Sequence, residues 1–210
     1  FSRANLSSTE ALRAAKKMKQ SGCYDVGFAL ESGNQEILEM MNKKIDVNAF
    51  LDTVNIFKEV GITVNTSVVF GYPTETKDTI RETFDQCLKA RIYPSIGFLL
   101  PLPATGMYDY AKQKGLIVDE DAYLESITER QDICLNMTKL SNEEIMSEIK
   151  KGAKVLNETL DLGLNENTYI KTKGYKNSKI KKKNLTVPET SRNENDVSFN
   201  YSNTQFEFES

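Results

Sequence analysis

The feature that most constrains this fold is the regular alternation of strand-like and helix-like segments. Two stretches rich in β-branched and aromatic residues, 24–30 and 62–70, each follow a glycine of the kind that ends a helix. These glycines, Gly22 and Gly61, lie 39 positions apart. A third apolar stretch, 95–100, is stopped by a proline, which cannot continue a strand ladder. The spacing predicts βα units that repeat at intervals of this length.

Helical patterns fill the intervals between these strands. Ser7 and Glu10 have the spacing of a capping box before an apolar helical face. Further helices are predicted over 35–42, 47–60, 77–90, 108–114 and 143–160. Strand, helix and strand in units of this length indicate right-handed crossovers and a parallel sheet, as an open doubly wound sheet or as a barrel. Neither GxGxxG nor GxxxxGK[ST] occurs, so a dinucleotide site and a P-loop both lack their main support.

The composition excludes several kinds of site. There is no histidine, and the three cysteines lie 64 and 47 positions apart, so histidine-dependent nucleophiles and the closely spaced Cys or His ligands of zinc and iron-sulfur sites are absent from the sequence. Cys23 and Cys87 are predicted to be core or near-core thiols. A net charge of −3 and the lack of a long apolar run argue against nucleic-acid and membrane partners. The odd number of cysteines, with no leader-like start, predicts a cytoplasmic location.

Three polar or irregular segments follow the predicted strands, where parallel α/β folds bind ligands. The first, 31–34, offers a carboxylate for the hydroxyls of a ribose, but it equally fits a cap for the next helix. The second, 70–76, has backbone that could approach a planar ring, although a helix cap alone accounts for it better. The third, 99–108, fits a turn over a barrel rim or an apolar pocket wall.

Taken together, four segments resemble the later half of the radical S-adenosylmethionine (SAM) barrel. They are GFALESG at 27–33, LEMMNK at 38–43, VFGYPTET at 69–76 and PLPATGMY at 101–108. Their order and spacing are most similar to the class of this superfamily that carries a cobalamin-binding domain. The resemblance implies an α/β fold, a partial TIM-like barrel with about four parallel strands of a (βα)6 barrel, followed by C-terminal helices.

The resemblance also implies cofactors and a site. In this superfamily SAM chelates a 4Fe-4S cluster and is cleaved to a 5′-deoxyadenosyl radical. The family pattern places Glu31 and Ser32 at the ribose, Phe70 and Gly71 beside the adenine, Leu99 and Leu100 near the adenine and the substrate, and Arg3 facing the cofactor. A structural salt bridge is the alternative role for Arg3. The catalytic residues and the substrate, a small molecule or another kind, are left open.

The sequence departs from the family in what it lacks. The CxxxCxxC cluster loop, the glycine-glycine-glutamate segment and the cobalamin domain all precede the matched segments and are absent. We therefore expect a fragment of the enzyme whose partner is the missing N-terminal half, and which alone neither binds iron nor cleaves SAM. The expected divisions are 1–115 for the barrel part, 116–165 for a helical extension and 166–210 for a disordered tail.

Two other functions fit the residues. One is a barrel enzyme that uses Glu31 and Glu75 as an acid/base pair, which would need the two carboxyl groups to face one pocket. The other is a non-catalytic half-barrel that binds a partner, with the lysine-rich run 171–183 as its docking element.

Overall fold

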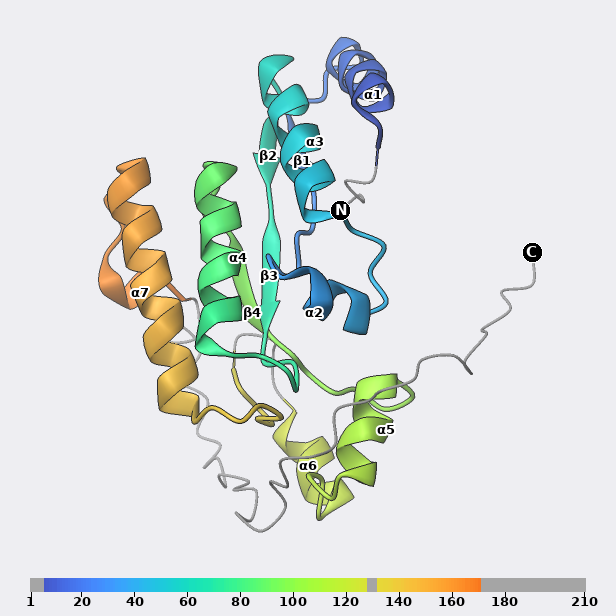
Figure 1. The fold of residues 1–210 in the computed structure, drawn as a ribbon, viewed down its shortest axis with the longest axis vertical. Helices are drawn as coiled ribbons and strands as arrows, with labels where there is room; N and C mark the ends of the chain where they lie inside the picture. Colours follow the sequence, from blue (N-terminus) through green and yellow to red (C-terminus); the bar gives the residue numbers. More distant parts are fainter. Residues whose placement is uncertain (1–5, 128–131, 171–210) are drawn as a thin grey trace, which may run out of the picture.

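The computed structural model describes residues 6–127 and 132–170, which form an α/β arrangement (Figure 1). The strands are β1 Asp25–Gly27, β2 Thr63–Asn65, β3 Ser67–Phe70 and β4 Ser95–Phe98. The α-helices are α1 Ser8–Gln20, α2 Gln35–Met40, α3 Val47–Glu59, α4 Lys77–Lys89, α5 Gly106–Gln113, α6 Glu120–Ser126 and α7 Asn142–Leu160, and a 3-10 turn, η1, spans Glu166–Thr168. Arg3 and the predicted tail beyond residue 170 lie outside the described residues.

Every helix predicted from the sequence is present, with ends shifted by a few residues. Ser7 and Glu10 form the predicted capping box of α1, and Ser141 and Glu144 form another at the start of α7. Helix α6 and turn η1 were not predicted. They carry little apolar periodicity, since α6 buries only Tyr123 and η1 buries no residue.

The strands are parallel, as predicted, but the long central strand is interrupted. Strand β2 pairs with β1, whereas β3 pairs with β4. The interruption lies at Thr66, whose Oγ1 accepts a hydrogen bond of 3.1 Å from the Leu30 amide while its carbonyl accepts one of 2.9 Å from Ser95. A single isolated bridge, Glu31 with Val68, continues the β1 side along β3. The segment that forms β2 and β3 therefore changes its neighbour at Thr66. The carboxyl ends of the β1 segment, β3 and β4 lie next to one another at one edge.

The two faces of these strands differ in chemistry. The side chains that face the helices are apolar and include Val64, Val68, Phe70, Ile96 and Phe98. Most of the alternate positions are short or polar, and among them Asp25, Thr63, Asn65 and Ser95 are exposed, whereas Val69 is buried in a second apolar cluster. On the covered side the helices lie in the order α1, α3, α4, α7 (Figure 1). This pattern is that of a barrel wall with helices outside and a polar inner face.

A second apolar cluster lies at the carboxyl ends of the strands, where α5 and α6 are found at the bottom of Figure 1. Leu99, Tyr108 and Tyr123 are buried in it, and the Tyr123 hydroxyl donates a 2.6 Å hydrogen bond to the Pro101 carbonyl. In the described residues, no helix is both long and apolar enough to cross a membrane.

Candidate functional site

Glu31 lies directly beyond β1 in an unusual backbone conformation. Its φ is +65°, in the left-handed region that side chains other than glycine rarely adopt. Two hydrogen bonds hold it against β3: its amide donates to the Ser67 carbonyl at 2.9 Å, and its carbonyl accepts from the Val69 amide at 2.8 Å. The carboxylate side chain is 13% exposed, and its Oε1 lies 3.1 Å from Lys43 Nζ. Strain of this kind is common at ligand sites, and here it coincides with a largely buried carboxylate at a strand end, so Glu31 is the strongest candidate among the described residues.

The residues after Glu31 shape the turn. Ser32 is buried, and its hydroxyl accepts a 3.1 Å hydrogen bond from the Asn34 amide. The Asn34 side chain in turn accepts from the Ile37 amide at 3.0 Å and caps α2. The capping role considered for this segment is therefore present, carried by Asn34 alone. The Glu31 carboxylate takes no part in the cap.

Gly33 packs tightly against helix α4. Its amide donates a 2.9 Å hydrogen bond to Thr83 Oγ1. A Cβ on Gly33 would lie 2.5 Å from the Thr83 Cα and 2.6 Å from the Glu82 carbonyl oxygen, closer than any side chain tolerates. Asn34 adds a 2.6 Å hydrogen bond from its Nδ2 to Glu82 Oε2. The turn after β1 is thus fixed to a helix that follows it by about fifty residues.

The second segment, after β3, is organised around Glu75. This side chain is 3% exposed and accepts a 3.2 Å hydrogen bond from the Gly71 amide. It also accepts one from the Thr79 hydroxyl. Burial raises the pKa of Glu75 to about 7, the nearby charge of Glu82 adds to that rise, and the two hydrogen bonds oppose it. Thr76, not Glu75, caps α4, so Glu75 turns inward and braces the strand end.

The strand ends beyond this turn lie next to one another. The Phe70 ring stacks on Phe84 at 5.7 Å beneath α4, so at the edge Phe70 offers only its backbone. Gly71 has a φ of +103°, and a Cβ there would approach the Cβ of Leu99 to 3.8 Å. Leu99 is buried at 8% exposure, and its neighbour Leu100 is half-buried. The structure therefore brings Gly71 and Leu99 together on the edge that also carries Glu31.

The described residues offer nothing that fits an iron-sulfur cluster. Within residues 6–127 and 132–170, no three His, Cys, Asp or Glu side chains gather as a metal site would require. Cys87 is fully buried, as predicted, and burial raises its thiol pKa to about 12. Cys23 is half-buried, and its Sγ lies 3.3 Å from the Asp25 carbonyl oxygen. The predicted core or near-core placement of both thiols is confirmed.

Together these features define a class: part of a parallel α/β barrel whose candidate ligand site is the carboxyl-end edge of its strands. Residues 3–87 match the family model of the radical SAM superfamily. In this segment the chain resembles the enzymes of that superfamily, as the motifs predicted.

Curated relatives resemble the chain in sequence, and a solved structure shares its fold. An uncharacterized methyltransferase of Pyrococcus horikoshii is 32% identical over 107 residues, which cover 50% of this chain and 23% of the relative. A tRNA-2-methylthio-N(6)-dimethylallyladenosine synthase of Protochlamydia amoebophila is 30% identical over 110 residues, covering 51% and 22%. Coproporphyrinogen III oxidase of Escherichia coli, described as a radical SAM enzyme, shares the fold with a TM-score of 0.52 at 16% identity, covering 75% of this chain and 31% of that one. The chain thus spans less than a third of the length of each of these proteins.

Sequence reasoning missed the residues that hold the site in place. Thr83 and Glu82 reach the first turn from α4, and no local pattern links positions so far apart. Lys43, the ion-pair partner of Glu31, lies at the end of the LEMMNK segment that carries part of the resemblance. That segment was therefore the only signal that pointed to one of them.

Proposed function

We propose that this chain forms the later part of the barrel of a radical SAM enzyme and holds the adenosyl group of SAM at the carboxyl ends of its strands. In this proposal the Glu31 carboxylate accepts hydrogen bonds from the ribose hydroxyls. The backbone at Phe70 and Gly71, with the side chain of Leu99, lies beside the adenine. When bound to a cluster held elsewhere in the enzyme, SAM supplies the radical, whereas the residues here orient it.

The observation that carries this proposal is the position and conformation of Glu31. Two hydrogen bonds join its left-handed backbone to β3, and within the described residues its carboxylate has a single polar partner, Lys43, which contacts Oε1. Carboxylates withdrawn from water need donors, and a ribose offers two hydroxyls. Ser32 shapes the turn through its hydrogen bond with the Asn34 amide, and the half-buried Leu100 follows Leu99 at the same strand end.

Replacing Glu31 with glutamine tests this role. We expect Glu31→Gln to weaken binding of S-adenosylhomocysteine by about tenfold, because charge-assisted hydrogen bonds are worth roughly 1.5–3 kcal/mol. The measurement is a calorimetric or NMR titration of the 210-residue chain. Glu39→Gln is the matched control, since Glu39 is an exposed glutamate on α2. Equal affinities for the two variants would contradict the ribose role of Glu31.

The structure gives the acid/base alternative less support. Glu75 has a raised pKa, which is common among catalytic carboxyls, but its oxygens bond to Gly71 and Thr79 within its own turn. Glu31 is engaged by Lys43 instead. The two carboxyls have different partners, and neither faces the other through any contact in the described residues.

The remaining parts of the proposal concern the whole enzyme. We propose that the N-terminal half, supplied from outside the described residues, brings the cluster ligands and, following the motif resemblance, a cobalamin domain. The reaction would then be a methyl transfer, a rearrangement or a ring closure on a substrate of unknown identity. Methyl transfer agrees with the name of the Pyrococcus relative. A cytoplasmic location and the absence of nucleic-acid partners stay predictions.

Reconstitution of the chain with iron tests its dependence on the other half. We expect anaerobic reconstitution of the 210 residues with iron and sulfide to give no 4Fe-4S absorbance, because its three cysteines are widely separated and one is fully buried. Iron and sulfide analysis would accompany the spectrum. A stoichiometric cluster of four irons per chain would overturn this expectation.

A further inference from the structure

One helix reaches both of the turns that the proposed function assigns to SAM. From α4, Thr83 accepts the hydrogen bond of the Gly33 amide, and Glu82 accepts one from Asn34. One turn earlier on the same helix, Thr79 donates to Glu75, which in turn holds the Gly71 amide. Thr79 and Thr83 are also linked directly, because the Thr83 hydroxyl donates a 3.0 Å hydrogen bond to the Thr79 carbonyl. The ribose-side and adenine-side turns therefore share a single support.

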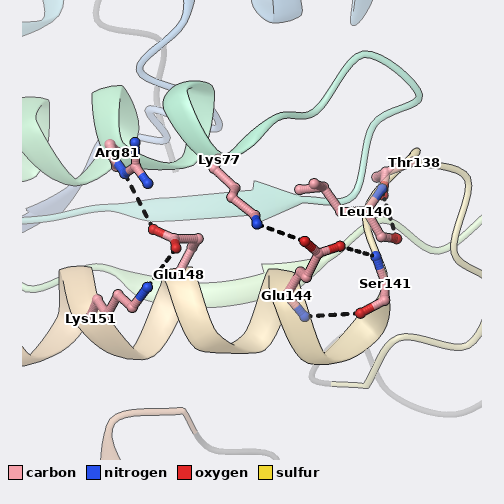
Figure 2. A network of polar contacts seen from close by, with 8 residues as sticks. All are labelled: Lys77, Arg81, Thr138, Leu140, Ser141, Glu144, Glu148 and Lys151. Carbon is pink, nitrogen blue, oxygen red and sulfur yellow. Dashed lines mark hydrogen bonds and ion pairs between the residues drawn. The ribbon is translucent and has the colours of Figure 1, made fainter.

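Helix α4 also packs against α7, and Figure 2 shows the ion pairs between these two helices. Lys77, the first residue of α4, forms a 2.6 Å ion pair with Glu144. Glu144 also completes the capping box of α7 with Ser141. One turn further along, Arg81 lies 3.3 Å from Glu148, a carboxylate whose side chain is only 6% exposed. The two turns of α4 that bind the segments after β1 and β3 are therefore themselves fixed by ion pairs to α7.

Building on the proposed function, we infer that Thr83 is a positioning residue for SAM: its hydroxyl fixes the turn of Glu31 and Gly33 so that the carboxylate meets the ribose. The hydroxyl does not touch the ligand edge, because Thr83 is buried at 1% exposure. It acts through the Gly33 amide, whose N–H group donates to Thr83 Oγ1 at 2.9 Å. A valine there keeps the shape of the side chain but leaves a buried donor unpaired.

The test compares two probes that differ in one ribose hydroxyl, 5′-deoxyadenosine and 2′,5′-dideoxyadenosine. We expect Thr83→Val to weaken the binding of 5′-deoxyadenosine by about tenfold, because a turn that is no longer fixed misplaces the Glu31 carboxylate, whose charge-assisted hydrogen bond to the ribose is worth roughly one to two factors of ten. The loss of affinity for 2′,5′-dideoxyadenosine should be several-fold smaller, because that probe lacks the 2′-hydroxyl, one of the two ribose hydroxyls that Glu31 would bind. Thr83→Ser restores the hydroxyl and should restore both affinities.

The matched control is Thr53→Val on α3. Thr53 is also a fully buried threonine, but its hydroxyl has no hydrogen-bond partner among the described residues. We expect this variant to bind both probes as the unchanged chain does. Amide hydrogen exchange at Gly33 reports the hydrogen bond to Thr83 without any ligand. It should accelerate in Thr83→Val but not in Thr53→Val.

The outcomes separate the two ideas. If the unchanged chain binds neither probe, the proposed function is contradicted, while exchange at Gly33 still decides whether Thr83 holds the turn. Equal losses for both probes in Thr83→Val, or no rescue by Thr83→Ser, would overturn the positioning role and leave the proposed function standing. Unchanged exchange at Gly33 would overturn it as well.

Discussion

Gly152→Ala in α7 is expected to destabilise the chain by about 2 kcal/mol, within the range typical of overpacked cores. Helix propensity alone predicts the opposite sign, because alanine in place of glycine inside a helix gains about 1 kcal/mol. The structure decides for packing: a Cβ on Gly152 would lie 2.3 Å from the ring of Phe84. That ring is 4% exposed and stacked on Phe70 at 5.7 Å, so a shift away from the new Cβ would disturb this stack.

Urea unfolding of the purified chain measures this effect. Lys150→Ala, at an exposed position of the same helix, should change the free energy of unfolding by less than about 0.5 kcal/mol. The double variant Gly152→Ala with Phe84→Leu should recover part of the loss, because the smaller side chain frees space at the contact. A stabilised Gly152→Ala chain would show that α7 does not pack on α4 as described.

Gly152 also matters because of where its contact leads. The Phe84 ring stacks on that of Phe70, and Phe70 directly precedes Gly71 at the proposed adenine edge. Shifting α7 outward would displace the Phe84 ring and remove support from the strand end. The close approach of α7 to α4 is therefore part of what positions the edge, in addition to the ion pairs of Lys77 and Arg81.

Local signals in the sequence were sufficient to predict most of the fold. Capping residues such as Ser7 and Ser141 and helix-ending glycines such as Gly22 act within a few positions, so they locate helix ends reliably. The break at Thr66 was not predictable, because the residue is β-branched and fits a continuous strand. What interrupts the strand is a pair of hydrogen bonds to segments distant in sequence.

The candidate site shows the same division. The strand-end rule and the motif resemblance pointed to Glu31 and Gly71, and the structure places both on one edge. Their supports were not visible in the sequence, since the contacts of Thr83 and Glu82 depend on how α4 docks. The inward turn of Glu75 was also missed, because an acidic residue before a helix usually complements the helix dipole in solvent.

Glu75→Gln is expected to remove most of the pH dependence of stability between pH 5 and pH 8. Burial raises the folded-state pKa of Glu75 to about 7, above the ordinary value of 4.5, so the folded chain holds a proton that the unfolded chain releases. The contribution of Glu75 to stability is therefore fully present below its pKa in the unfolded chain, and it is lost as the pH rises through its pKa in the folded chain. The difference between the two pKa values corresponds to a loss of about 3 kcal/mol in the free energy of unfolding by pH 8.

Glutamine mimics the protonated carboxyl group at this position. Its carbonyl oxygen can accept the hydrogen bond of the Gly71 amide, as Glu75 does, without a buried charge. We therefore expect Glu75→Gln to match the unchanged chain near pH 5 and to exceed its free energy of unfolding at pH 8 by about 2–3 kcal/mol. Denaturant titrations at the two pH values give both numbers.

The pH window isolates Glu75 from the other shifted carboxyls. The pKa values of Glu144 and Glu148 are lowered by hydrogen bonds to Lys77 and Lys151 respectively, so these groups titrate below pH 4.5 and have the opposite effect on stability. Glu39→Gln should retain the full decline between pH 5 and pH 8, since Glu39 is exposed. A decline of the same size in Glu75→Gln would show that another group releases the proton, and the inward brace at Gly71 would then carry its charge at neutral pH.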